Sequence, residues 1–142
     1  MSSPSCADSR RPHSLAEAMQ WGEALGNVDA YIREFLDEFY VQGDASKREA
    51  MLSEEPPLGS NERANAYVAA VAEHLAFRMH RAPPDWVSHQ ARFLKRPFFP
   101  AGLESLKATL LVESPTAFRR RLIFVGADPL YRPRRGQIGI DT

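Results

Sequence analysis

Cysteine is almost absent from this sequence, since Cys6 is the only one among 142 residues. An intramolecular disulfide is therefore excluded, and neither a cysteine-based metal site nor a catalytic cysteine at a structured position is supported. Residues 1–14 lack the apolar stretch of a signal peptide, and the longest apolar runs, at 66–72 and 122–125, are far too short to span a membrane. We expect a cytoplasmic protein with no membrane partner.

The patterns that carry known catalytic chemistry are also missing. No Gly-x-Ser-x-Gly sequence is present for a serine nucleophile, and residues 43–47 are too short for a phosphate-binding loop. His74 and His80 are six residues apart, which places them on different sides of a helix, and His89 lies beyond two prolines, so no metal-ligand spacing is found. The sequence predicts no catalytic residue, no cofactor and no metal site, and hence a protein that is not an enzyme.

The composition favours one folded domain. Apolar residues make up 44% of the chain and charged residues 25%, both close to the average for globular proteins. Residues 1–14 form a flexible N-terminal tail in this interpretation, residues 15–131 a helical domain, and residues 132–142 a C-terminal tail rich in Arg, Pro and Gly.

Helical periodicity is clear in the first half of the chain. Ser14 and Glu17 have capping-box spacing and predict a helix through about Leu25. A second helix has an acidic outer side, and a short helix over 47–52 and a proline loop over 54–59 follow it. The apolar positions of the second helix are Ile32, Phe35, Leu36, Phe39 and Tyr40.

The second half predicts further helices with proline-rich connections. Ser60 is expected to cap the longest helix, which would run to Pro83, and Asp85 to cap a short one. Leucines predict a helix over 103–111, and Ser114 is expected to cap another that includes residues 117–122; residues 123–126 fit either a helix or a brief extended piece. The fold class is therefore all-α, a single-domain bundle of about five to seven short helices.

Charge is divided unevenly along the chain. From Glu17 to Glu62 there are eleven Asp and Glu against three Lys and Arg, a net of minus eight. From Arg63 to the end there are thirteen Lys and Arg against six Asp and Glu, a net of plus seven, and arginines gather near the end. Such a chain can bind a charged partner or pair one half with the other.

Arginine and aromatic residues near the end are the candidate partner-binding residues. They are Phe118, Arg119, Arg120, Arg121, Tyr131, Arg132, Arg134 and Arg135. In one interpretation residues 119–121 pair with an acidic helix face that carries Glu34, Asp37 and Glu38. In a second, the arginines contact nucleic-acid phosphates, although a pI near 6.9 is low for a dedicated nucleic-acid domain. In a third, they bind an acidic protein partner.

Four segments carry a family resemblance: FLDEFY at 35–40, EEPPL at 54–58, AAVAEHLA at 69–76 and VESPTAFRRRLIF at 112–124. In these the chain resembles small, largely uncharacterised bacterial proteins, some of them behind a helix-turn-helix, that look like the antitoxin or regulatory partner of nucleotidyltransferase-type toxins. The likeness runs from about Asp29 to Tyr131. It implies that the partner is another protein, such as a toxin encoded nearby.

The sequence thus favours a non-catalytic, protein-binding bacterial protein, antitoxin-like or regulatory, that uses an arginine and aromatic surface near its C-terminus. A nucleic-acid-binding regulator that contacts phosphates through the same arginines is the alternative. Ahead of residue 29 only one helix is predicted, which is too little for a helix-turn-helix.

Overall fold

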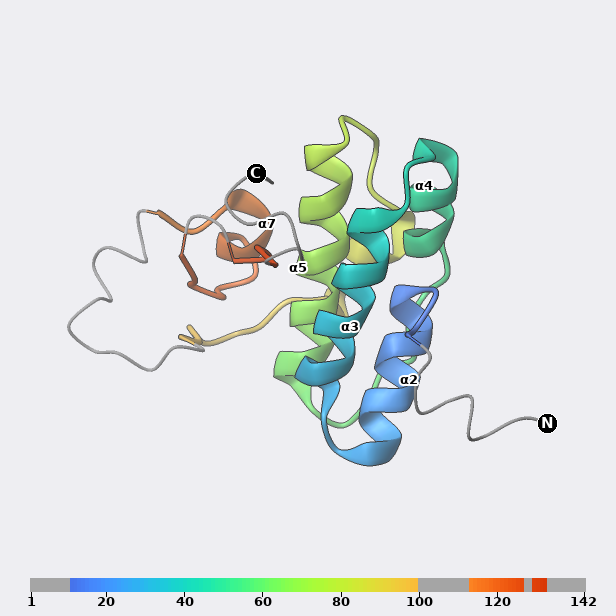
Figure 1. Ribbon diagram of the computed structural model, residues 1–142. Helices are drawn as coiled ribbons and strands as arrows, with labels where there is room; N and C mark the ends of the chain where they lie inside the picture. The colour runs from blue at the N-terminus through green and yellow to red at the C-terminus, as the bar shows by residue number, and fades with distance from the viewer. Residues whose placement is uncertain (1–10, 100–112, 127–128, 133–142) are drawn as a thin grey trace. The chain divides into compact units, whose positions relative to one another are not determined.

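The structure is a computed structural model that describes residues 11–99, 113–126 and 129–132 (Figure 1). These residues form five α-helices and two 3-10 helices, and their only β pairing is an isolated parallel bridge between Phe98 and Ile123. The predicted all-α fold class is confirmed. The helix predicted over 103–111 lies outside the described residues. No helix in the described part of the chain has the length and apolarity needed to cross a membrane.

The chain divides into two compact units, which we call unit 1 (Met1–Pro57) and unit 2 (Leu58–Thr142). The division falls within the predicted proline loop at 54–59. Unit 1 has eleven Asp and Glu against five Lys and Arg, a net of minus six, and unit 2 has seven against thirteen, a net of plus six. The charge asymmetry of the sequence therefore coincides with the two units. One helical domain over 15–131 stays a prediction.

Unit 1 begins with α2 (Leu15–Leu25), which starts and ends where the sequence predicts. The Ser14 hydroxyl accepts a hydrogen bond from the Glu17 amide at 3.0 Å, and the Glu17 carboxylate accepts one from the His13 amide at 2.7 Å. The first bond satisfies an amide of the first helical turn, and the second fixes the residue before the cap. Gly26 ends the helix in the left-handed conformation, with φ 72°.

Helix α3 (Val28–Val41) lies beside α2 in Figure 1. A Cβ atom on Gly22 would stand only 2.4 Å from the Val28 Cα, so glycine is required where the two helices meet. The apolar side of α3 is buried as predicted, apart from the half-buried Tyr40. Its buried residues are Ile32, Phe35, Leu36 and Phe39.

Helix α4 (Ala45–Ser53) is longer than the predicted 47–52, because Asp44 caps it and the helix begins at Ala45. The Asp44 carboxylate accepts hydrogen bonds from the amides of Ser46 at 2.8 Å and Lys47 at 3.3 Å. Arg48 then donates to the carbonyls of Phe39 and Tyr40, both at 3.2 Å. These bonds satisfy two carbonyls at the C-terminal end of α3.

Unit 2 is built on α5 (Glu62–Arg78), whose cap is Asn61 and not the predicted Ser60. The Asn61 side chain accepts from the amides of Arg63 and Ala64 at 3.0 and 3.2 Å. The helix ends well before Pro83, because His80 adopts a left-handed conformation with φ 58°. The Arg81 amide donates to the Ala76 carbonyl at 2.9 Å, which is the closing bond of a Schellman motif.

Two 3-10 helices follow, η1 (Asp85–Ser88) and η2 (Gln90–Arg92), in place of the predicted short helix. Asp85 is not the cap that was predicted, because it is the first residue of η1. The cap position is held by Pro84, which makes no side-chain capping hydrogen bond. Trp86 is buried, and Trp21 in unit 1 is half-buried.

Helix α7 (Thr116–Arg119) is shorter than predicted. Leu122 takes a left-handed conformation with φ 64°, and the Ile123 amide donates to the Phe118 carbonyl at 2.9 Å, so the chain turns out of the helix. Ser114 does not cap it: the Ser114 hydroxyl bonds both the amide and the carbonyl of Val125 at 2.9 Å. Of the two predictions for residues 123–126, the β bridge at Ile123 supports the brief extended piece and not the helix.

We predict that Gly22→Ala destabilises unit 1. The added methyl group would have to push the backbone at Val28, a strain that typically costs about 1–3 kcal/mol and outweighs the roughly 1 kcal/mol by which Ala favours a helix. Chemical denaturation measures the change in the free energy of unfolding. Gly43→Ala is the matched control, because its Cβ would meet nothing within 4 Å. Equal stability of the two variants would contradict the close approach of Val28 to Gly22.

Candidate protein interface on unit 2

The candidate residues at 118–121 do not share one environment. Phe118 and Arg121 are both fully buried, with 0% of their surface exposed. Phe118 packs against Tyr67 and His74 of α5, with ring centroids 5.8 and 5.7 Å apart. These two candidates hold α7 to α5 in the folded unit and are not available on its surface, which corrects their assignment as contact residues.

Glu73 of α5 binds two of the three consecutive arginines. Its Oε1 accepts a hydrogen bond from Arg121 Nη1 at 2.6 Å, and its Oε2 accepts one from Arg120 Nη1 at 3.0 Å. The Glu73 side chain is 14% exposed, that of Arg120 45% and that of Arg121 0%. For Arg120 and Arg121, the acidic partner is therefore on α5 and not on the Glu34, Asp37 and Glu38 face.

Arg121 uses its guanidinium to join three segments of unit 2. Besides Glu73, it donates to the Ala117 carbonyl at 2.8 Å and to the Val87 carbonyl at 2.6 Å. Its Nε is buried and bonds no acceptor among the described residues. Burial lowers the pKa of Arg121, while the hydrogen bond and negative charge of Glu73 oppose that change. Glu73 is therefore the negative partner of a positive charge inside the fold.

Phe93 lies under both arginines. The centre of its ring is 4.5 Å from the Arg121 Cζ and 5.2 Å from the Arg120 Cζ. A guanidinium over a ring face gains a cation–π attraction. Phe93 and Glu73 together fix the position of Arg120, whose side chain stays 45% exposed.

Phe77 is not among the residues predicted from the sequence, yet it is the most exposed large apolar residue described, at 73%. It lies one turn after Glu73 on the same face of α5, since residues four apart are neighbours on a helix. The exposure of Phe77 could have been predicted from the sequence, because Phe77 falls outside the apolar stripe of that helix. Helical spacing thus places Phe77 next to the residue, Glu73, that Arg120 binds.

The remaining candidates are placed as follows. Arg119 is exposed at the end of α7, Tyr131 is 49% exposed and Arg132 is half-buried. Arg134 and Arg135 lie outside the described residues. We call Phe77, Phe93, Arg119 and Arg120 the α5–α7 surface; its members come from two helices and the segment after η2.

The histidines do not come together at this surface. His74 is buried against Phe118, His80 is exposed after α5, and the His89 Nδ1 accepts a bond from the Ala91 amide at 3.2 Å. Among the residues that the structure describes, no group of three or more His, Cys, Asp or Glu could hold a metal ion.

Fold and surface together define an all-α protein whose helix α5 carries an exposed phenylalanine and a carboxylate that binds two arginines. No protein-family model matches the chain, and the searches of curated proteins and of solved structures also give no match.

We predict that Arg121→Ala destabilises the protein far more than Arg120→Ala. Removing Arg121 leaves three acceptors of a largely buried site without their donor, and breaking such a pair typically costs about 3–5 kcal/mol. Removing Arg120 breaks an exposed pair, which typically costs about 0–1 kcal/mol. Urea denaturation of both variants tests this, and similar losses at the two positions would contradict the assigned roles.

Proposed function

We propose that this protein acts by binding another protein and is not itself an enzyme, in the antitoxin-like or regulatory role that its resemblance implies. The binding surface is the α5–α7 surface, continued by Tyr131 and Arg132. The observation that carries this proposal is the 73% exposure of Phe77, one turn after the residue, Glu73, that binds the partly exposed Arg120. The partner and the cytoplasmic location are part of the same proposal.

An exposed phenylalanine ring is a source of binding free energy. Burying a side chain of this size contributes about 1.5–3 kcal/mol, and aromatic residues and arginine are the types that concentrate in interface centres. Because Glu73 and Phe93 already hold the Arg120 guanidinium, less side-chain freedom is lost when a partner binds it. These features support a partner that offers an apolar pocket for Phe77 and acidic groups near Arg120.

Nucleic-acid binding through the same arginines is less well supported. Of residues 119–121, Arg121 is buried and cannot reach a phosphate, and Arg120 shares the single carboxylate of Glu73 with it. Phosphate contacts draw their affinity from the neutralisation of charge by such cations. The contacts of Arg120 and Arg121 favour the protein partner.

We predict that Phe77→Ala weakens binding to the protein encoded by the neighbouring gene by at least about tenfold, as for a moderate hot spot. The variant should keep the stability of the parent, because little of Phe77 is buried. Co-expression followed by co-purification and calorimetry measures the affinity. Leu25→Ala in unit 1, which removes another side chain of similar exposure (67%), is the control and should bind as the parent does.

Two results would contradict the proposal. One is the lack of a complex with any neighbouring gene product, together with no protection of growth from a toxic neighbour. The other is a complex whose affinity is unchanged by Phe77→Ala and by Arg120→Glu, which would place the interface elsewhere.

A further inference from the structure

We propose that unit 1 carries a second binding surface, which takes up a cationic amphipathic segment of another protein. We call this surface the α2–α3 face, and its residues are Leu25, Val28, Tyr31, Glu34 and Glu38. All of them belong to unit 1, whereas the α5–α7 surface belongs to unit 2. The proposal therefore does not depend on the function proposed above.

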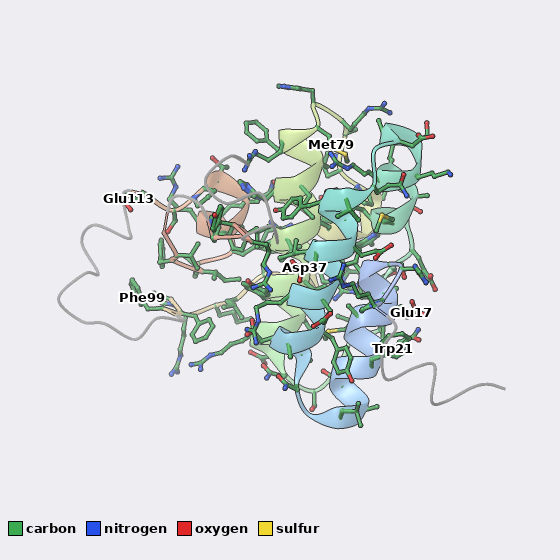
Figure 2. The ribbon with its side chains drawn as sticks, in the orientation of Figure 1. Glu17, Trp21, Asp37, Met79, Phe99 and Glu113 are labelled. Atoms are coloured by element: carbon green, nitrogen blue, oxygen red, sulfur yellow. The ribbon has the colours of Figure 1, made fainter. Side chains whose placement is uncertain are left out.

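The apolar part of this face lies where α2 and α3 meet. Leu25, the last residue of α2, is 67% exposed, and Val28 and Tyr31 of α3 are half-buried. The rings of Trp21 and Tyr31 meet across the two helices, with centroids 5.9 Å apart and planes at 83°. Figure 2 shows Trp21 on α2, where that helix runs beside α3. Because Leu25 follows Trp21 by one helical turn, Leu25 and Tyr31 are both neighbours of this one side chain.

Acidic residues continue the face along α3. Tyr31, Glu34 and Glu38 are spaced by three and then four residues, which places them in one row on the helix surface. The Glu34 side chain is 52% exposed and that of Glu38 is 32% exposed. Apolar and acidic groups therefore follow one another along about 15 Å of helix, from Val28 to Glu38.

A guanidinium of the protein itself lies on the acidic part of the face. The Arg11 Nε is 3.5 Å from the Glu34 Oε1, and the Arg11 Nη1 is 3.9 Å from the Glu38 Oε1. Both distances exceed the roughly 2.7–2.9 Å of a charge-assisted hydrogen bond, and the Arg11 side chain is 42% exposed. Exposed ion pairs of this kind contribute little to stability. The two carboxylates thus accept a cation that an arginine or lysine of a partner can displace.

The charges along α3 select a cationic partner. Arg11 brings one positive charge to the two carboxylates of Glu34 and Glu38, so one negative charge remains. Arg33, the one cation in the sequence of α3, is paired with Asp29. A segment with lysine or arginine beside leucine-like residues complements both the acidic and the apolar part of the face. An acidic segment would be repelled, and a neutral apolar one would leave the carboxylates without a new partner.

The test is fluorescence anisotropy of the full-length protein with a labelled peptide of about fourteen leucines and lysines at helical spacing. The double variant Glu34→Gln, Glu38→Gln should weaken binding at least about fivefold, because each exposed charge pair contributes up to about fivefold. Leu25→Ala should weaken binding at least about threefold, because less apolar surface is buried on binding. Glu54→Gln removes an exposed carboxylate of unit 1 outside the face and should bind as the parent does.

Arg11→Ala separates this face from a general attraction between opposite charges. If the peptide displaces Arg11, removing that side chain should strengthen binding by about two- to fivefold, because a competitor for the two carboxylates is lost. Lys47→Ala is the matched control, since it removes an exposed cation of unit 1 and changes the net charge by the same amount. Lys47→Ala should bind as the parent does.

The proposal is overturned if the parent protein does not bind the peptide at low salt, or if the double variant binds it like Glu54→Gln. It is also overturned if Arg11→Ala binds no more tightly than Lys47→Ala. A dimer seen by light scattering and abolished by Leu25→Ala would overturn it as well, since the face would then bind a second copy of this chain. Phe77→Ala should bind the peptide as the parent does, so the two surfaces can fail independently.

Discussion

The carboxylate of Glu73 is the group on which the described part of unit 2 depends most. Through Arg121 it joins α5 to the carbonyl of Ala117 in α7 and to the carbonyl of Val87 in η1. Because Arg121 is fully buried, its charge is tolerated only with a negative partner and several acceptors around it. The same carboxylate also positions Arg120, so one residue links the core of the unit to its surface.

This constraint divides the arginines of unit 2 by role. Arg121 and Arg92 are buried and belong to the core; Arg92 donates to the Asn65 carbonyl at 3.4 Å and lies over the Trp86 ring. Arg120 is a surface residue held by an ion pair, and Arg63 is a surface residue held by a ring. A count of charges along the sequence treats all of them alike, whereas only the surface ones can meet a partner.

Much of the fold follows from local signals in the sequence. The Ser14 and Glu17 cap, the apolar side of α3 and the proline loop at 54–59 depend on residues close together in the chain, and each appears as predicted. The predictions are wrong where a different residue caps a helix or ends it. Asn61 caps α5 in place of Ser60. His80 and Leu122 adopt left-handed conformations after their helices, and because neither is a glycine, the sequence does not indicate these helix ends.

The candidate site was less predictable because its contacts are distant in sequence. Both Arg120 and Arg121 were predicted to be on the surface, and both bind Glu73, 47 and 48 residues earlier. Only Arg121 also reaches the Val87 carbonyl, 34 residues earlier, and is buried. Nothing in the run of three arginines indicates that the third, Arg121, is buried in the core. Phe77, by contrast, could have been found, since its place off the apolar stripe of its helix indicates exposure.

The central claim is that Arg121 is a buried core residue while its neighbour Arg120 remains on the surface. Modification of the native protein with phenylglyoxal, followed residue by residue with mass spectrometry, tests this most directly. Arg120 and the exposed Arg63 should react, and Arg121 should stay protected until urea unfolds the protein. Modification of Arg121 in the native protein at the rate of Arg63 would contradict this assignment.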